Sequence, residues 1–345
     1  MVNFIEGFIP SPKDTRDFIT TAVIPCDLGL ESRFSWQDKD PVCINQGNFG
    51  TCTGCATAGI KDVHEFVEGD YVDGGFSPLF IYSICKTLDG MPNQVGSTPR
   101  TAMQVLLGYG VLPEKDMPYS TLTDINNLPK INLDMINKAS KYKIKSYARV
   151  PDGDLISLKQ ALKVSPVLLG VYVYDSFIKC EYGGFIPSVS GYLRGGHAIK
   201  CIGWDDELTH TYADGKTKKG FLILKNSWGT TWGNKGLCYV AYEDYFWKSD
   251  LGMPFVVEAW SCVDLVTTIV PKYYKVQVGA YAIKDNANNM VQKLKAKGFS
   301  TYLPPVSPDG LYRVQVGAFI YKTGAVTLLS RLKEAGFNGY IVNPQ

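Results

Sequence analysis

The sequence has no apolar run approaching the roughly 18 residues that a helix needs to cross a bilayer. Its opening, MVNFIEGFIPSPKDTRDFIT, lacks the basic start and the apolar block of a secretion signal. We therefore expect a protein without a transmembrane segment that is synthesised in the cytoplasm. If it acts outside the cell, something other than an N-terminal signal must release it.

Closely spaced cysteine pairs are nearly absent. The nine cysteines are an odd number, and only Cys52 and Cys55 lie close together in the sequence. This pattern argues against a disulfide framework and favours synthesis in a reducing compartment. A zinc site would need two further ligands, and the chain has no second closely spaced Cys/His pair. We therefore expect no bound metal.

Net charge is small, at +2, but it is unevenly distributed. Residues 272–345 contain ten basic and three acidic residues, a net charge of +7, which leaves −5 for the preceding residues. Such an asymmetry indicates a separate C-terminal module with an anionic partner.

Two copies of one motif make up this C-terminal module. The segments YKVQVGAYAIKDNANNMVQKLKAKGFSTYL (274–303) and YRVQVGAFIYKTGAVTLLSRLKEAGFNGYI (312–341) align without a gap at a period of 38 residues. Each copy predicts a strand, a helix and a strand, and each helix stops at a glycine suited to a left-handed cap, Gly298 or Gly336. Two βαβ halves predict a βαββαβ module, in which two helices back a four-stranded sheet.

The duplicated VQVGAF-type strand resembles that of the sporulation-related repeat (SPOR) domains, and this resemblance implies binding to the glycan strands of peptidoglycan. If the valines face the helices, polar and aromatic side chains share the open face. The expected glycan-binding residues are Lys275, Gln277, Tyr281, Arg313, Gln315 and Phe319. One alternative is a merely solvated face. Another is an RNA-binding sheet, but the Lys/Arg-Gly-Phe signature is missing, so we expect no nucleic acid.

The segment CINQGNFGTCTGCATAGIKDVHEF predicts a reactive cysteine. Its first part reads as a loop, and from Thr51 onward apolar residues recur at helical spacing. Cys52 therefore falls on the first turn of a helix. There the helix dipole and free N–H groups favour a thiolate, which predicts a lowered thiol pKa and a nucleophile.

Only three histidines could serve as the base for this thiol. His64 lies twelve residues after Cys52 on the same predicted helix, roughly 18 Å along its axis, and cannot reach it. His210 lies in the polar run DDELTHTYADGKTKKG, which we interpret as an exposed loop. His197, in the strand-like segment GGHAIKCIGW, is the remaining candidate.

An orienting group for that histidine follows in LILKNSWGTTWG. The side-chain oxygen of Asn226 can accept the imidazole N–H of His197, which fixes the ring orientation and tautomer. Trp228 would shield that hydrogen bond from water.

Together the segments NQGNFGTC, GGHAIKCIGW and KNSWGTTWG resemble the motifs of the papain-family cysteine peptidases, in the family's order. His197 lies 145 positions after Cys52, which suits the papain spacing. The resemblance implies Cys52 as nucleophile, His197 as base and Asn226 as orienting amide. It also implies that Gln46 and the N–H of Cys52 form the oxyanion hole. The mechanism requires no metal or cofactor.

The resemblance implies an α+β, two-lobed fold, with a helical lobe, a β-barrel-like lobe and the cleft between them. We expect this domain to span residues 33–262 and to be joined by a linker, 263–271, to the SPOR-like domain, 272–345. The head, residues 1–32, resembles the short N-terminal segment of bacterial members of the family. It could cover the cleft or pack on the surface. We expect a monomer.

Two departures from the family pattern stand next to the nucleophile. Phe49 replaces a cysteine, so a standard disulfide is lost, and Thr53 replaces an aromatic residue. A thioredoxin-like interpretation of CTGC would leave His197 unexplained, and no βαβ unit precedes the motif. Cys55 fits better as a small buried residue on the inner face of the helix.

Substrate contacts are also implied by the family resemblance. Gly96 and Ser97 align with the stretch whose backbone pairs with extended substrate. Gly170 and Ala198 would give a roomy specificity pocket, near Trp228, although Gly170 could instead mark a bend in a strand.

An amide-cleaving domain joined to a glycan-binding domain indicates action at the bacterial cell wall. The leading hypothesis is an endopeptidase for peptidoglycan stem peptides or cross-bridges, such as a phage-type or spore lytic enzyme released by lysis. One alternative is a wall-tethered protease of surface proteins. A catalytically inert peptidoglycan-binding protein is a more distant alternative.

Overall fold

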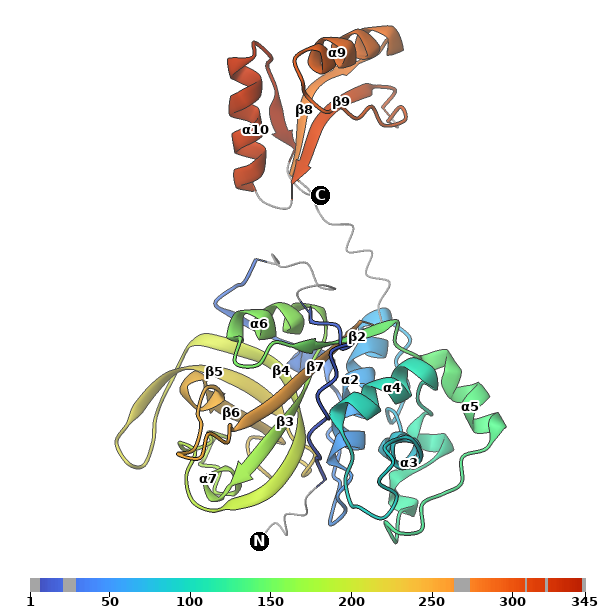
Figure 1. The fold of residues 1–345 in the computed structure, drawn as a ribbon, viewed down its shortest axis with the longest axis vertical. Coiled ribbons are helices and arrows are strands. Elements are labelled where there is room, and N and C mark those ends of the chain that lie inside the picture. The colour runs from blue at the N-terminus through green and yellow to red at the C-terminus, as the bar shows by residue number, and fades with distance from the viewer. Residues whose placement is uncertain (1–6, 21–28, 264–273, 308, 320–321, 343–345) are drawn as a thin grey trace. The chain divides into compact units, whose positions relative to one another are not determined.

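The computed structural model describes residues 7–20, 29–263, 274–307, 309–319 and 322–342. It divides the chain into one unit of residues Met1–Leu265 and another of residues Val266–Gln345, drawn in Figure 1. The expected linker, 263–271, lies outside the described residues apart from Val263.

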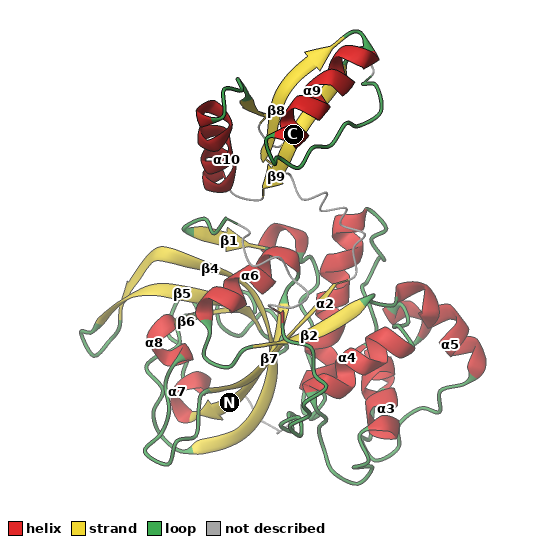
Figure 2. Ribbon diagram, turned by 45° about the horizontal axis from the view of Figure 1, so that its top comes forward, coloured by secondary structure: helices red, strands yellow, loops and turns green. Residues whose placement is uncertain are grey.

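The first unit has a lobe of helices beside a lobe built on one sheet (Figure 2). Residues Cys52 to Glu65 of the central helix, α2, are all buried, because small and apolar side chains dominate this stretch. Helix α2 packs against helices α3 and α4 and against strand β4. The helices of this lobe are α2 (Cys52–Glu68), α3 (Pro78–Leu88), α4 (Pro99–Gly108) and α5 (Leu133–Ala139), with short 3-10 turns η1 (Gln37–Lys39), η2 (Glu114–Asp116), η3 (Tyr119–Thr121) and η4 (Ser140–Tyr142).

Local sequence sets where two of these helices begin. Ser77 and Thr98 each accept a backbone N–H with their side chain, and each is followed by proline at the first helical position. Helix α2 has no such side-chain cap at Thr51, and it ends at Gly69, whose φ of 84° is the left-handed conformation that glycine adopts readily.

The second lobe is a seven-stranded antiparallel sheet in the order β2-β7-β3-β4-β5-β6, with β1 also paired to β4. Its core contains Leu169, Ile199, Trp204 and Leu224. The elements are β1 (Arg33–Ser35), β2 (Ser146–Val150), α6 (Leu155–Val164), β3 (Val167–Tyr174), α7 (Asp175–Ile178), β4 (Leu193–Thr211), β5 (Thr217–Lys225), β6 (Leu237–Ala241), α8 (Tyr242–Tyr245) and β7 (Val256–Val263).

The predicted exposed loop around His210 is wrong. Strands β4 and β5 continue into this region, and His210 pairs with Lys218 across the ladder. The imidazole stacks on Phe185 with ring centroids 3.8 Å apart, and its Nε2 lies 3.2 Å from a carboxylate oxygen of Glu181. The polar segment around His210 is therefore part of a β-hairpin formed by β4 and β5, and stacking of His210 on Phe185 holds it against the sheet.

The second unit contains β8 (Tyr274–Tyr281), α9 (Lys284–Ala296), β9 (Tyr312–Phe319), α10 (Lys322–Glu334) and β10 (Tyr340–Val342). Its described strands form a three-stranded sheet in the order β10-β8-β9. In place of the fourth predicted strand there is a single bridge between Tyr302 and Gln315. Pro304 and Pro305 follow Tyr302 and have no N–H to extend the ladder. As predicted, Gly298 and Gly336 follow the helices with positive φ.

Within the described residues, no helix is both long enough and apolar enough to span a membrane.

Candidate active site

Cys52 is the first residue of α2, as the sequence predicts, and it is fully buried. Its Sγ accepts a hydrogen bond from the backbone N–H of Ala198 at 3.2 Å. Because Ala198 follows His197 on β4, this contact joins the helix that carries the cysteine to the strand that carries the histidine.

His197 lies near the start of β4, and Asn226 directly follows the neighbouring strand β5. The Nε2–H of His197 donates to Oδ1 of Asn226 at 2.8 Å. The Trp228 ring lies over this pair, with its centroid 5.0 Å from that of the imidazole. Both the histidine and the asparagine are buried, so the orienting hydrogen bond is shielded from water.

Gln46 is held beside the asparagine by a residue that sequence reasoning missed. The hydroxyl of Ser227 donates to Oε1 of Gln46 at 2.6 Å, and the backbone N–H of Ser227 donates to Oδ1 of Asn226 at 2.8 Å. The Nε2 of Gln46 donates one N–H to the carbonyl of Phe49. Its second N–H can donate elsewhere. The only available signal for Ser227 was its place directly after Asn226.

The predicted lowering of the thiol pKa is wrong for this state of the protein. Burial raises the pKa of Cys52 to about 12, although the N–H of Ala198 opposes this shift. Burial likewise lowers the pKa of His197 to about 4, partly opposed by its bond to Asn226. In this buried state the charged forms of both groups are therefore disfavoured.

The described part of the head, residues 7–20, runs between α2 and β3, as Figure 1 shows in dark blue. The N–H of Ile9 donates to the carbonyl of Ser97, and the N–H of Ser97 donates to the carbonyl of Gly7. The N–H of Gly7 donates to the carbonyl of Gly196. Of the two alternatives left open by the sequence, the described part of the head covers the cleft.

Three of the predicted substrate-contact residues meet the head directly. Gly96 has a φ of 93°, and a Cβ there would lie 2.9 Å from the backbone of Gly7, so a side chain would keep the head away. A Cβ on Gly170 would lie 2.3 Å from the ring of Phe8. Ser97 pairs with Phe8.

Phe8 packs against the residues from which the sequence predicted a specificity pocket. Its buried ring packs over Gly170 and Gly196 and lies 6.3 Å from the Tyr172 ring, and Ala198 belongs to the same apolar cluster. The alternative for Gly170 also holds, since the pairing of β3 with β7 shifts register between Gly170 and Val171.

Family comparisons agree with this arrangement. Residues 30–249 match the papain family cysteine protease model. The chain belongs to the papain family of cysteine proteases. Residues 270–343 match the SPOR domain model, so both resemblances seen in the sequence are confirmed.

Several known proteins are similar to the peptidase unit of this chain. A peptidase C1-like protein, L477, of Acanthamoeba polyphaga mimivirus is 26% identical, over 71% of this chain and 77% of its own length. Cathepsin J of Mus musculus is 24% identical, over 63% of this chain and 62% of its own. The crystal structure of xylellain, a cysteine protease from Xylella fastidiosa, superposes with a TM-score of 0.61. It is 28% identical, over 75% of this chain and 96% of its own. The predicted α+β, papain-like fold is thus confirmed.

The face of the second unit differs from the predicted glycan site. Gln277 is buried, and its Nε2 donates to the hydroxyl of Tyr340 at 2.6 Å. Tyr281 and Phe319 pack against the apolar cluster between sheet and helices. Two register shifts in the pairing of β8 with β9, next to Gln277, break the alternation on which the prediction relied.

Three other predicted residues of this face remain accessible. Lys275 is exposed, and Gln315 and Arg313 are partly exposed. The guanidinium of Arg313 forms a two-pronged ion pair with Asp309. Their role in glycan binding stays a prediction.

Proposed function

We propose that this protease is an endopeptidase that acts at the bacterial cell wall, where its SPOR domain binds glycan strands. The hydrogen bond of Ala198 to Cys52 and that of His197 to Asn226 support the chemistry. Ser227 then links Asn226 to Gln46. The SPOR match supports the location.

In the proposed mechanism, the sulfur of Cys52 attacks a peptide carbonyl after His197 has taken its proton. Asn226 keeps the imidazole oriented through its 2.8 Å hydrogen bond. Gln46 and the N–H of Cys52 bind the oxyanion of the tetrahedral intermediate. His197 then protonates the leaving amine, and water hydrolyses the thioester on Cys52. Cys52 and His197 are fully buried, so the reaction requires the cleft to open for substrate.

Peptidoglycan peptides remain the leading substrate, but one observation favours the alternative of surface proteins. The ring of Phe8 lies over Gly170 and Gly196, so the space left by these glycines accommodates an aromatic side chain. Stem peptides are built from small and charged residues, whereas proteins offer aromatic and large aliphatic side chains for such a pocket.

Digestion of purified cell walls tests the proposal. The protein and a Cys52→Ala variant are incubated with walls stripped of protein, and in parallel with an unfolded protein such as reduced casein. Mass spectrometry then detects new amino termini. Termini on muropeptides that require Cys52 establish a wall-lytic endopeptidase. Casein cleavage together with uncut walls that still co-sediment with the protein identifies a tethered protease. No Cys52-dependent termini in either substrate would contradict the proposed activity.

A further inference from the structure

We propose that Tyr119 is a positioning residue of the oxyanion hole, which it reaches from a distant part of the helical lobe through a chain of hydrogen bonds. This inference rests on the proposed function, because it takes Gln46 and the backbone N–H of Cys52 as the two donors to the oxyanion. The hydroxyl of Tyr119 connects the two segments that carry these donors.

The two donors belong to different segments, so the distance between them has to be fixed. Gln46 stands in the loop before helix α2, whereas Cys52 is the first residue of that helix. A misplacement of about 1 Å in a catalytic arrangement can slow a reaction by about a hundredfold. Every cysteine among the described residues is free, so no disulfide between described cysteines ties the two segments together. Hydrogen bonds must therefore do so.

Tyr119 joins the two segments through its hydroxyl. It lies in the 3-10 turn η3, and its Oη donates to the carbonyl of Gln46 at 2.9 Å. The same Oη lies 2.5 Å from Oγ1 of Thr51, the residue directly before Cys52. A phenol has one proton and a carbonyl oxygen can only accept, so the Thr51 hydroxyl must donate to Tyr119. Donation therefore runs from Thr51 to Tyr119 and from Tyr119 to Gln46.

The hydroxyl of Thr51 is used for this contact and not for capping its helix. Threonine at an N-cap position commonly accepts a backbone N–H of the first turn. Thr51 is the N-cap residue of α2, yet its side chain makes no such bond. The carbonyl of Thr51 and the N–H of Cys52 belong to one rigid peptide unit. Holding Thr51 in place therefore also holds the second oxyanion donor.

Tyr119 is itself fixed through its own turn. Its N–H donates to Oε1 of Glu114 at 2.6 Å, and the hydroxyl of Ser77 donates to the carbonyl of Met117 at 2.6 Å. Because Ser77 is the N-cap residue of α3, this turn is attached to the helical lobe. Burial raises the pKa of Tyr119, so the phenol keeps the proton that it donates.

Gln46 is held from the sheet lobe as well. Its backbone N–H donates to the carbonyl of Ser227 at 2.8 Å, and its side chain accepts from the Ser227 hydroxyl at 2.6 Å. Without the phenol hydroxyl, its carbonyl would keep only the longer bond from the N–H of Phe49, at 3.4 Å. Gln46 would then be held by the sheet lobe and by its own loop, and its distance from the N–H of Cys52 would no longer be set.

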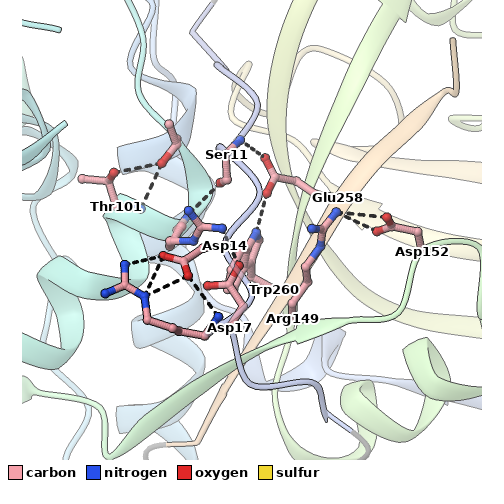
Figure 3. Close-up of polar contacts among 11 residues, drawn as sticks. Ser11, Asp14, Asp17, Thr101, Arg149, Asp152, Glu258 and Trp260 are labelled. Carbon is pink, nitrogen blue, oxygen red and sulfur yellow. Dashed lines mark hydrogen bonds and ion pairs between the residues drawn. The ribbon is translucent and has the colours of Figure 1, made fainter. Parts of the chain in front are cut away.

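The head takes no part in this chain of hydrogen bonds. Its contacts lie elsewhere, as Figure 3 shows for the N–H of Ser11, which donates to Glu258 at 2.8 Å. No hydrogen bond of residues 7–20 involves Thr51 or Tyr119. The contacts of Tyr119 should therefore persist whether or not the head occupies the cleft.

Two reactions of Cys52 separate a positioning role from a general structural one. Acylation by p-nitrophenyl acetate forms a carbon–sulfur bond and places negative charge on the carbonyl oxygen before p-nitrophenolate leaves, so it uses the oxyanion donors. Alkylation by iodoacetamide displaces iodide from a saturated carbon and forms no oxyanion. The intact protein is treated with either reagent near pH 7.5 and quenched in acid, and each adduct on the Cys52 peptide is quantified by mass spectrometry over time. Both reactions require access to Cys52, so their ratio is independent of it.

Tyr119→Phe removes one oxygen atom and keeps the ring. We expect acylation to slow about tenfold, whereas alkylation should change less than about twofold. Tyr142→Phe is the matched control. Tyr142 packs against the same apolar cluster as Tyr119, with its ring centroid 4.9 Å from that of Phe76, and its hydroxyl bonds to no described residue. Both rates should stay within about twofold of the wild type in this control.

Thr51 tests the other end of the connection and keeps the test valid if Tyr119→Phe does not fold. Thr51→Val preserves the shape of the side chain but loses the hydroxyl, and we expect acylation to slow about fivefold. Thr51→Ser restores the hydroxyl and should recover most of the lost rate. Alkylation should change less than about twofold in both variants.

A double-mutant cycle shows whether Tyr119 acts through Gln46. Gln46→Ala removes the donor amide but keeps the carbonyl that Tyr119 binds, and it should slow acylation about a hundredfold. Adding Tyr119→Phe to this variant should slow acylation by less than about twofold more, because no side-chain donor remains to be positioned.

The outcomes separate this inference from the proposed function. Slower acylation at unchanged alkylation in Tyr119→Phe and Thr51→Val, without a further loss in the Gln46→Ala background, supports the inference. It is overturned if Tyr119→Phe is acylated as fast as the wild type, if both reactions slow together, or if the tenfold loss persists in Gln46→Ala. If the wild type is alkylated but never acylated at Cys52, the proposed function fails and the inference falls with it.

Discussion

The two units of the chain bury different kinds of side chain. The peptidase unit encloses ionisable groups, among them His64, His197, Lys200 and Asp40, whereas Gln277 is the one buried polar side chain among the described residues of the C-terminal unit. Buried charges cost desolvation, so such groups are retained where a fixed arrangement matters. The difference teaches that charge and pH should affect the stability of the first unit more than that of the second, although apolar packing contributes to both.

Lys200 should show the largest effect in the first unit. Its ammonium donates to Asp40 and to the carbonyl of Gly59, both at 2.8 Å, and so joins β4 to helix α2. Lys200→Met would leave Asp40 buried without its partner, and we expect a loss of about 3–5 kcal/mol in the free energy of unfolding. Tryptophan fluorescence in urea measures it, because all six tryptophans precede residue 263.

The control for Lys200 is a surface ion pair. Lys219→Met removes the contact with Glu207, in which both side chains are more than half exposed, and should cost less than about 1 kcal/mol. Equal losses in the two variants would contradict the role given to the buried pair.

Truncating a buried leucine of the C-terminal unit should have the next largest effect on stability. The loss should be confined to that unit. Leu294 and Leu332 occupy matching places in the two repeats, and both are fully buried. Either change to alanine should destabilise this unit by about 3 kcal/mol. Hydrogen exchange of β8 would report the loss, while the tryptophan transition stays unchanged. Val326→Ala, at a half-exposed position of α10, should change exchange little.

Acid should destabilise the peptidase unit through His64. Burial holds the pKa of His64 at about 3, below its ordinary value of 6.5, so the unfolded chain binds a proton that the folded unit excludes. Stability is complete above pH 6.5 and falls as pH drops toward the folded pKa. We expect a loss of about 2 kcal/mol from His64 between pH 7 and pH 5. Between pH 7 and pH 5, the His64→Gln variant should lose about 2 kcal/mol less of its free energy of unfolding than the unmodified protein. If both proteins show the same pH dependence, His64 is not the group responsible.

The smallest predicted effect concerns the hydrogen bond of Gln277. Tyr340→Phe removes the hydroxyl that accepts from its amide, and we expect a loss of about 1 kcal/mol in the C-terminal unit. Tyr302→Phe removes the hydroxyl of an exposed tyrosine. It should change the free energy of unfolding of the C-terminal unit by only about a few tenths of a kcal/mol. Thermal unfolding followed by hydrogen exchange would distinguish them.

The catalytic constellation could be predicted because each member carries a local signal. Cys52 begins a helix with regular apolar spacing, while His197 and Asn226 stand in short strand-like segments with recognisable neighbours. Backbone pairing then brings these segments together. The structure places them as expected, but their catalytic roles remain proposals.

The failures have a common physical origin in contacts between distant parts of the chain. Burial raises the pKa of Cys52, and Gly7 of the head, which is distant in the sequence, is one of the residues that lie against its sulfur. Gln277 is buried because shifts in strand register move it off the open face. Neither contact leaves a periodic signal in the sequence.

The central claim, that Cys52 is the nucleophile of this protease, is tested most directly by trapping the acyl-enzyme. The protein is mixed with a p-nitrophenyl ester, quenched in acid and digested, and each cysteine peptide is weighed by mass spectrometry. We predict an acyl adduct on Cys52 alone, greatly reduced in His197→Ala. An adduct on another cysteine, or ester turnover that persists in Cys52→Ala, would contradict it.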